Sequence, residues 1–141
     1  MTREDNPMRT PATILVVDDD PDIREVLRTV LAKEGYRITA ASNGKEAMAV
    51  IEADAPDLMI LDIMMTTDTE GFDLMFELQG DPRFKDIPII LLTSFLEKVR
   101  SAGPGGFEHI VDERWGARWI FEKPIDIPRL IQMVEAILDE R

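Results

Sequence analysis

The sequence has no cysteine, one histidine and few aromatic residues, which make up 6% of the chain. Without cysteine, the chain has no disulfides, no thiolate metal ligands and no cysteine nucleophile. The single histidine, His109, has no second histidine or cysteine with which to share a metal, so we expect it to be a surface residue. Zinc sites of the cysteine and histidine type are therefore excluded as a basis for function.

Positive charge and long apolar runs are also scarce. The chain has 16 lysines and arginines against 28 aspartates and glutamates, which gives a formal net charge of -12. Such a surface repels the phosphates of DNA and of anionic lipids, which argues against a DNA-binding domain. No apolar run approaches the roughly 18 residues that span a bilayer. The polar opening MTREDNPMRTP also lacks the apolar core of a signal peptide. We therefore expect a cytoplasmic protein that neither binds DNA nor inserts into a membrane.

The length of 141 residues suits one domain, and a hydrophobic content of 45% is enough to build its core. Residues 1–11 carry charges, two prolines and no periodicity, so we expect a mobile N-terminal tail. The domain then occupies residues 12–141.

Strand and helix patterns alternate along that domain. Continuous apolar runs predict five strands that are buried on both faces, as in a parallel sheet covered by helices, at residues 13–17, 36–40, 57–61, 87–92 and 119–122. A helical apolar stripe follows the first strand, with Asp20 and Pro21 suited to begin that helix and Gly35 suited to end it; its members are Ile23, Val26, Leu27, Val30 and Leu31. Further helices are predicted around residues 47–51, 72–76 and 127–138. The alternation predicts an α/β fold.

Polar residues stand at the carboxyl ends of four predicted strands, where ligands collect in open α/β sheets. They are Asp18, Asp19, Asp62, Thr93 and Lys123. Clustered carboxylates suit Mg²⁺, which prefers oxygen ligands together with phosphate oxygens. A lysine and a threonine beside the metal would hold the other phosphoryl oxygens, and one carboxylate would be free to act as a nucleophile at phosphorus.

Four ordered motifs at these positions resemble the receiver domain of bacterial two-component response regulators: VVDDDPDI at 16–23, LMILDIMM at 58–65, IILLTSF at 89–95 and FEKPI at 121–125. The resemblance covers residues 13–140. It implies a flavodoxin-like three-layer sandwich in which a five-stranded parallel sheet, order 2-1-3-4-5, lies between helices.

The resemblance also implies the roles of the site residues. Asp62 would be the phosphoacceptor for a histidine kinase or phosphotransfer protein, with Thr93 bonded to the phosphoryl group and Lys123 paired with it. Mg²⁺ would be held by Asp18, Asp19, Asp62 and the main-chain carbonyl of Met64. Such a chain is a phosphoacceptor signalling domain and not an enzyme with a separate substrate. Because Met64 and Phe95 flank the approach of water, we expect slow autodephosphorylation.

The chain departs from the family pattern between Thr93 and Lys123, which lie 30 positions apart, about eight more than is usual in the family. We expect an extended segment at 95–115, made of two helices separated by the GPGG break at 103–106. Ile120 occupies the position of the family's aromatic switch residue, so bulkier candidates for that role are Phe95, Trp115 and Trp119. No effector domain is expected after residue 141, so residues 95–119 are the expected surface for a downstream protein partner.

Two other classes stay open. A small Mg-dependent phosphatase of the haloacid dehalogenase type also uses an aspartate nucleophile, and Asp18 with Asp20 could mimic its DxD signature. A pseudo-receiver would bind a partner without being phosphorylated, although the complete set of acids argues against it. The position of the modified residue would separate the first class from a receiver, and a Mg²⁺ titration would test the second.

Overall fold

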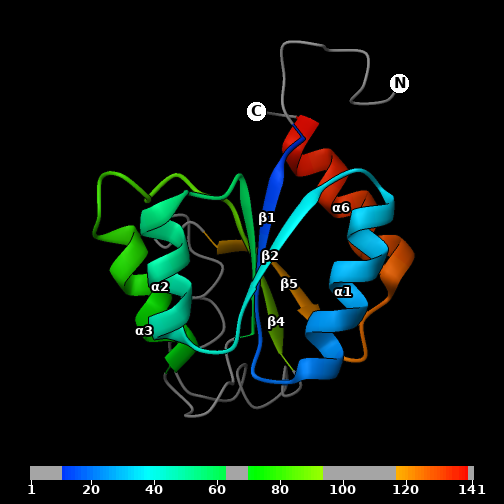
Figure 1. The fold of residues 1–141 in the computed structure, drawn as a ribbon, viewed down its shortest axis with the longest axis horizontal. Helices are drawn as coiled ribbons and strands as arrows, with labels where there is room; N and C mark the ends of the chain where they lie inside the picture. Colours follow the sequence, from blue (N-terminus) through cyan, green and yellow to red (C-terminus); the bar gives the residue numbers. More distant parts are fainter. Residues whose placement is uncertain (1–10, 63–69, 94–116, 140–141) are drawn as a thin grey trace.

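Five parallel strands form one sheet in the computed structural model, which describes residues 11–62, 70–93 and 117–139 (Figure 1). The strands are β1 (Thr13–Val17), β2 (Arg37–Ala41), β3 (Leu58–Asp62), β4 (Ile89–Thr93) and β5 (Ala117–Glu122). Their order across the sheet is β2-β1-β3-β4-β5, and each neighbouring pair is parallel. The predicted order and fold class are therefore confirmed.

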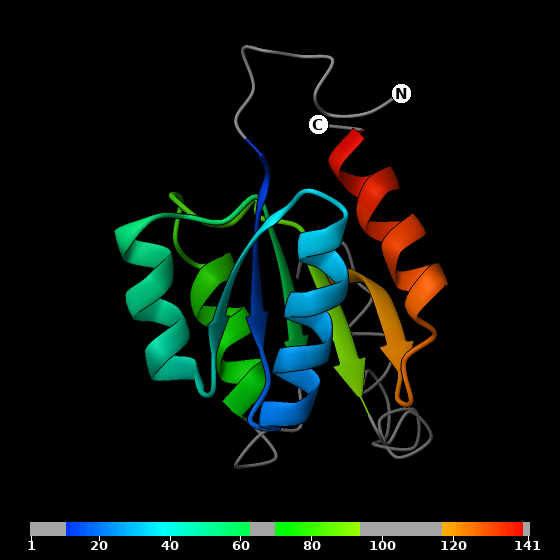
Figure 2. The same ribbon diagram turned by 45° about the vertical axis from the view of Figure 1, so that its right-hand side comes forward.

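Helices cover the two faces of this sheet in pairs, α1 (Pro21–Lys33) with α6 (Ile127–Asp139) and α2 (Gly44–Ala53) with α3 (Glu70–Gln79) (Figures 1 and 2). Because successive strand residues point to opposite faces, the strands feed two separate cores. Alternate residues of β1, such as Leu15 and Val17, pack on the α2 and α3 side, whereas Ile14 and Val16 pack on the α1 and α6 side. This is the predicted three-layer arrangement.

The first helix begins and ends where its sequence signals predict. Asp20 is its N-cap and accepts a hydrogen bond from the Asp22 amide at 2.9 Å, with Pro21 in the first turn. Gly35 follows the C-cap with φ of 96°, a left-handed conformation that glycine adopts without steric cost.

The predicted apolar stripes are wider than the buried faces of the helices. Val26 in α1 is 48% exposed and Phe76 in α3 is 47% exposed, while Leu27 and Met75 beside them are fully buried. A helix packed on a sheet covers one arc of its surface, and the outermost apolar positions of a broad stripe stay in solvent. Val26, a member of the predicted stripe, and Phe76, in the helix predicted around residues 72–76, therefore lie at exposed helix positions.

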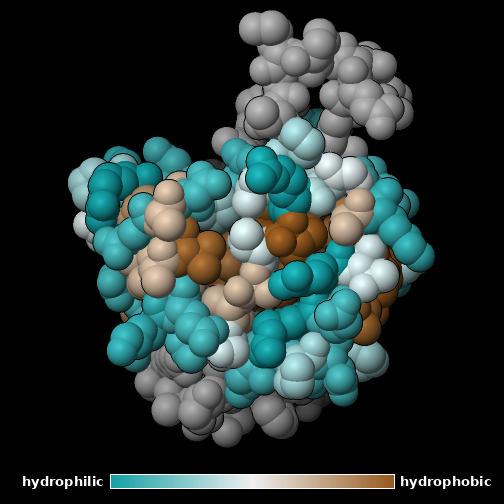
Figure 3. All heavy atoms as spheres, in the orientation of Figure 1, coloured by the Kyte–Doolittle hydropathy of each residue, from teal (hydrophilic) through white to brown (hydrophobic). Residues whose placement is uncertain are grey.

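The edge strand β2 lies in front in Figures 1 and 3. Figure 3 shows apolar residues gathered in the middle of this face, between hydrophilic residues on the surrounding helices. Ile38, Thr39 and Ala40 in β2 are only partly buried, as expected for a strand with one open side.

Among the described helices, none is long and apolar enough to cross a bilayer.

Three predictions fall on residues outside the described ranges: the mobile tail over residues 1–10, the carbonyl of Met64, and the extended segment at 95–115. The structure therefore tests the sheet, its four flanking helices and the side chains at the described strand ends.

Candidate functional site

The carboxyl end of β1 delivers two adjacent aspartates to one edge of the sheet. The amide of Asp18 donates to the Ala41 carbonyl at 3.1 Å, which continues the pairing of β1 with β2 by one residue. The Asp18 side chain is fully buried, while Asp19 is exposed. A buried carboxylate needs partners that replace water, and the surroundings of Asp18 supply them.

Asp62 is the last residue of β3, which lies next to β1, and Thr93 is the last residue of β4, which lies next to β3. In the register of the sheet, Asp62 lies opposite Leu92, so Thr93 lies one position further along the same edge. Asp62 is 3% exposed and Thr93 is fully buried. We predicted that both residues follow their strands, and they instead form the final strand positions. Their side chains are therefore held by the sheet itself.

Lys123 reaches the same edge from the chain that leaves β5. Its amide donates to the Thr93 carbonyl at 2.9 Å, which fixes its backbone beside the end of β4. Its ammonium Nζ donates to Oδ2 of Asp18 at 2.9 Å and to Oδ2 of Asp62 at 3.3 Å. One cation thus joins two buried acids from different strands.

The electrostatic setting of Lys123 keeps it charged. Burial lowers the pKa of Lys123, but the hydrogen bond and charge of Asp18, followed by those of Asp62, outweigh burial and raise the pKa above its ordinary value. The side chain is 16% exposed, and its ammonium is held by both acidic partners.

Three carboxylates could share a metal ion at this edge: Asp18, Asp19 and Asp62 each offer an oxygen, and these oxygens lie within 4.8 Å of one another. Mg²⁺ binds oxygen at about 2.1 Å, so opposite ligands lie about 4.2 Å apart across the ion. Small side-chain adjustments would bring the three oxygens into that range. Three acids with one lysine also leave negative charge for a divalent cation to balance, so the donor set fits Mg²⁺.

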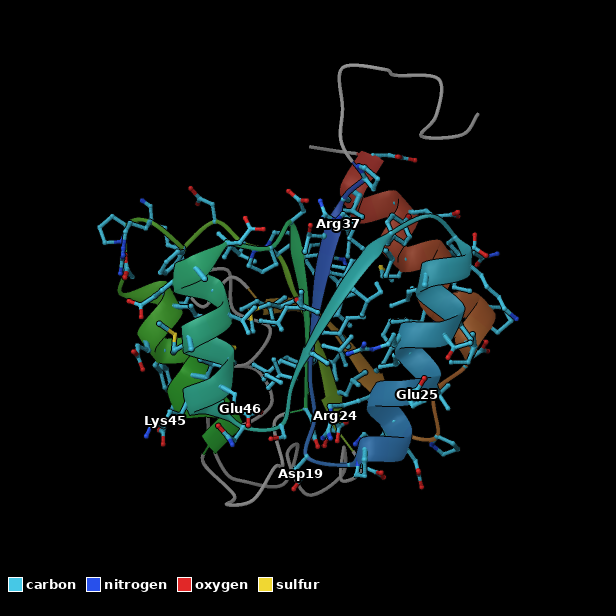
Figure 4. All side chains as sticks on the ribbon, in the orientation of Figure 1. Asp19, Arg24, Glu25, Arg37, Lys45 and Glu46 are labelled. Atoms are coloured by element: carbon cyan, nitrogen blue, oxygen red, sulfur yellow. The ribbon has the colours of Figure 1, made fainter. Side chains whose placement is uncertain are left out.

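Arg24 in α1 makes a contact at this edge that its sequence context does not predict. Its Nη1 donates to the main-chain carbonyl of Asp18 at 2.7 Å. Figure 4 shows Arg24 at the same end of the sheet as Asp19 and Glu46, with Arg37 at the opposite end. The only sequence signal is a basic residue between the apolar positions Ile23 and Leu27, which gives no indication of a carbonyl partner.

The structure describes some of the remaining predicted site and switch residues and not others. Asp20 caps α1 and is not one of the three acids that could share a metal, which weakens the DxD interpretation of Asp18 with Asp20. Ile120 packs with the α2 and α3 side of the core, and Trp119 packs with the other side. Trp119 therefore cannot replace an aromatic residue at position 120 on the same face. Phe95 and Trp115 lie outside the described residues.

Comparisons with known proteins agree with this geometry. The model of the response regulator receiver domain family matches residues 14–135. Protein PilH of Pseudomonas aeruginosa is 30% identical, and the match covers 90% of this chain and 98% of PilH. The response regulator MprA of Mycolicibacterium vanbaalenii is 34% identical over 91% of this chain and 51% of its own length, so the chain spans about half of that relative.

This chain is also similar to a solved response regulator structure that contains a bound ligand. The response regulator TrrA of Thermotoga maritima, in complex with Mg²⁺ and BeF, is 35% identical and superimposes with a TM-score of 0.70. The match covers 89% of this chain and 98% of TrrA.

Proposed function

Because the chain belongs to the response regulator receiver domain family, we propose that Asp62 accepts a phosphoryl group from a histidine kinase or phosphotransfer protein. Receiver domains are signalling domains that bind Mg²⁺ at an acidic pocket, and they are broadly non-enzymatic. The observation that carries the proposal is the buried Asp62 carboxylate, which ends β3 beside two further acids and bonds to Lys123 at 3.3 Å.

The proposed step is a phosphoryl transfer between two side chains. A carboxylate oxygen of Asp62 attacks the phosphorus of a phosphohistidine, the P–N bond breaks, and an acyl phosphate forms on Asp62 while the electron pair returns to the imidazole of the donor. Lys123 pairs with the phosphoryl oxygens, and the hydroxyl of Thr93 donates a hydrogen bond to one of them. Both side chains are held at the sheet edge before the donor arrives.

Mg²⁺ belongs to the proposal as the resident cation. Asp18, Asp19, Asp62 and the main-chain carbonyl of Met64 would hold it, where it would neutralise charge on the transferring phosphoryl oxygens. The grouping of three carboxylate oxygens within 4.8 Å supports this assignment. Asp18 and Asp62 are already tethered by Lys123, so a metal ion would have to compete with the ammonium for their oxygens.

The proposal also covers the downstream partner, the lifetime of the acyl phosphate and the cellular location of the protein. A downstream protein partner would dock on residues 95–119, and the acyl phosphate would decay slowly because Met64 and Phe95 cannot orient a water molecule. The acidic net charge of -12 supports a protein partner over DNA. A cytoplasmic location suits a domain that receives its phosphoryl group from a kinase.

The test is to locate the phosphoryl group after treatment with a small phosphodonor and Mg²⁺. We expect one group on Asp62 by mass spectrometry of the wild type, and none on Asp62→Asn, which keeps the size of the side chain but removes its nucleophilic charge. Asp57→Asn is the matched control, because Asp57 lies before β3 at the opposite end of the strand. It should be labelled like the wild type.

The two alternatives give other outcomes in the same experiment. Modification of Asp18 in place of Asp62 would favour the phosphatase of the haloacid dehalogenase type. Mg²⁺ binding without any labelling would favour the pseudo-receiver. Unchanged labelling of Asp62→Asn at an unrelated residue would contradict the assigned phosphoacceptor.

A further inference from the structure

Asp18 is held at four points, by contacts from β2, from the N-cap and the body of α1, and from the chain after β5. Its amide bonds to β2 through the Ala41 carbonyl at 3.1 Å, and its Oδ1 accepts from the Asp20 amide at 2.9 Å. Its Oδ2 accepts from Lys123, also at 2.9 Å, and its carbonyl accepts from Arg24 at 2.7 Å. The Arg24 contact is the shortest of the four, as expected when a charged guanidinium is the donor.

The Asp18 carbonyl belongs to the peptide unit that leads into Asp19. This unit is planar, so fixing the direction of the carbonyl also fixes the direction in which the Asp19 amide and Cα leave it. Among the described residues, no hydrogen bond or ion pair holds the exposed Asp19 carboxylate itself. Its position relative to Asp18 and Asp62 therefore depends on the backbone that carries it.

We propose that Arg24 is a positioning residue for the metal site, which orients Asp19 through the Asp18 carbonyl and so completes the group of three carboxylates. The inference rests on the proposed function, because it assumes that this group binds Mg²⁺. Arg24 is partly buried and begins the second turn of α1, and its own amide bonds to the Asp20 carbonyl at 3.1 Å. The start of the helix and the metal site are thereby joined by one side chain.

Two effects of Arg24 on a cation have opposite signs, and this makes the proposal testable. The guanidinium charge repels Mg²⁺, so a residue that acted by charge alone would tighten Mg²⁺ binding when it is removed. A residue that orients a ligand would weaken binding when it is removed. Loss of residues that orient metal ligands typically lowers metal affinity about 10–100-fold, which exceeds the effect expected of a solvent-screened charge.

The experiment is a calorimetric Mg²⁺ titration of the full chain and three variants. We expect Arg24→Met to raise the Kd for Mg²⁺ about tenfold, at the low end of that range because Arg24 acts through the backbone. Arg24→Lys, which keeps the charge and a donor on a shorter arm, should show an intermediate loss of about threefold. Arg28→Met is the matched control: Arg28 lies one turn later in α1, is exposed, and carries the same charge, so its removal should leave Kd within about twofold.

A second measurement separates positioning from general damage to the fold. The rate of labelling by a phosphodonor should be slow for Arg24→Met at low Mg²⁺ and should return to within about twofold of wild type at saturating Mg²⁺. A merely structural role would lower the thermal midpoint without moving the Mg²⁺ dependence. If Arg24→Met does not fold, the titration of Arg24→Lys decides between a weaker and an unchanged affinity.

The outcomes distinguish the inference from the function on which it rests. Wild type that binds Mg²⁺, together with an Arg24→Met variant of equal or tighter affinity, overturns the positioning role and leaves the receiver function standing. A labelling defect that persists at saturating Mg²⁺ overturns it as well. Wild type that binds no Mg²⁺ overturns both the metal site and the role of Arg24.

Discussion

The two ends of the parallel sheet treat acidic residues in different ways. At the amino end, Asp57 precedes β3, its Oδ2 accepts from the Thr13 amide at 2.8 Å, and its own amide donates to the Thr13 carbonyl at 2.8 Å. At the carboxyl end, Asp18, Asp19 and Asp62 lie together, and two of them share the ammonium of Lys123. At the amino end, Asp57 is bonded to backbone, whereas at the carboxyl end three acids lie together and two of them bind one cation.

This difference separates a structural acid from a functional group of acids. Asp57 joins the start of β1 to the start of β3, so it contributes to strand pairing and to register. Three carboxylates within 4.8 Å repel one another, and burial of two of them adds a desolvation cost. An arrangement that costs stability indicates selection for binding or chemistry.

The largest expected effect comes from removing the cation at the carboxyl end. We expect Lys123→Met to lower the rate of labelling by a phosphodonor about 100-fold, because a charged donor to the phosphoryl oxygens is lost. Asp57→Asn, at the amino end, should change the rate by less than about twofold. Initial rates at saturating Mg²⁺ measure both.

Stability controls are needed for this variant, because Lys123 also bonds two buried acids. Urea unfolding should confirm that Lys123→Met is folded under the labelling conditions. Equal loss of rate in the Lys123 and Asp57 variants would remove the distinction between the two ends of the sheet.

The sequence predicted the sheet well because its signals are local and repeated. Five apolar runs gave all five strands within about two residues of their observed bounds, and Asp20 with Gly35 marked the limits of α1. The convergence of Asp18, Asp62 and Lys123 was also predictable, since parallel strands bring their carboxyl ends to one edge. The strand order needed the family resemblance, because periodicity does not state which strands are neighbours.

Other features depend on three-dimensional packing that one sequence does not encode locally. Val26 and Phe76 fit a helical stripe, but how much of that stripe is covered depends on the sheet beneath it. The bond from Arg24 to the Asp18 carbonyl depends on the path of the backbone between β1 and α1. A side chain to main-chain contact of this kind has no composition signal.

A smaller effect is expected when the exposed acid of the group is neutralised. Asp19→Asn should weaken Mg²⁺ binding about tenfold, because a charged oxygen ligand becomes a neutral one. The free energy of unfolding without Mg²⁺ should not fall, since one source of repulsion within the group is removed. A calorimetric titration and urea unfolding measure the two quantities, and an unchanged Kd would contradict the assignment of Asp19 as a ligand.

Replacing the acid at the amino end should lower the stability of the fold and leave Mg²⁺ binding unchanged. Asp57→Ala removes the acceptor for the Thr13 amide and should lower the free energy of unfolding by about 1 kcal/mol. Because Asp57 lies at the far end of β3 from Asp62, the Kd for Mg²⁺ should stay within about twofold. A large loss of Mg²⁺ affinity in this variant would mean that the two ends of the sheet are coupled.

The smallest expected effect is a pH dependence that belongs to the carboxyl end alone. The pKa of Lys123 in the folded chain lies above the ordinary lysine value of 10.5 because the bonds and charges of Asp18 and Asp62 outweigh burial. Below that value Lys123 is protonated in both the folded and unfolded states, so its contribution to stability is fully present. Above it the folded chain binds more protons than the unfolded chain, and the contribution is lost as pH rises through the raised pKa.

Urea unfolding of wild type and Lys123→Met in the absence of Mg²⁺ isolates this contribution, because the other titrating groups are common to both chains. The difference in unfolding free energy should be constant from about pH 7 to about pH 10 and should decline above that. Asp57→Ala, at the opposite end of β3 from the Lys123 site, should differ from wild type by the same amount across this range. A Lys123 difference that instead grows with pH between neutral pH and about pH 10 would mean that burial, and not the two acids, sets the pKa of this lysine.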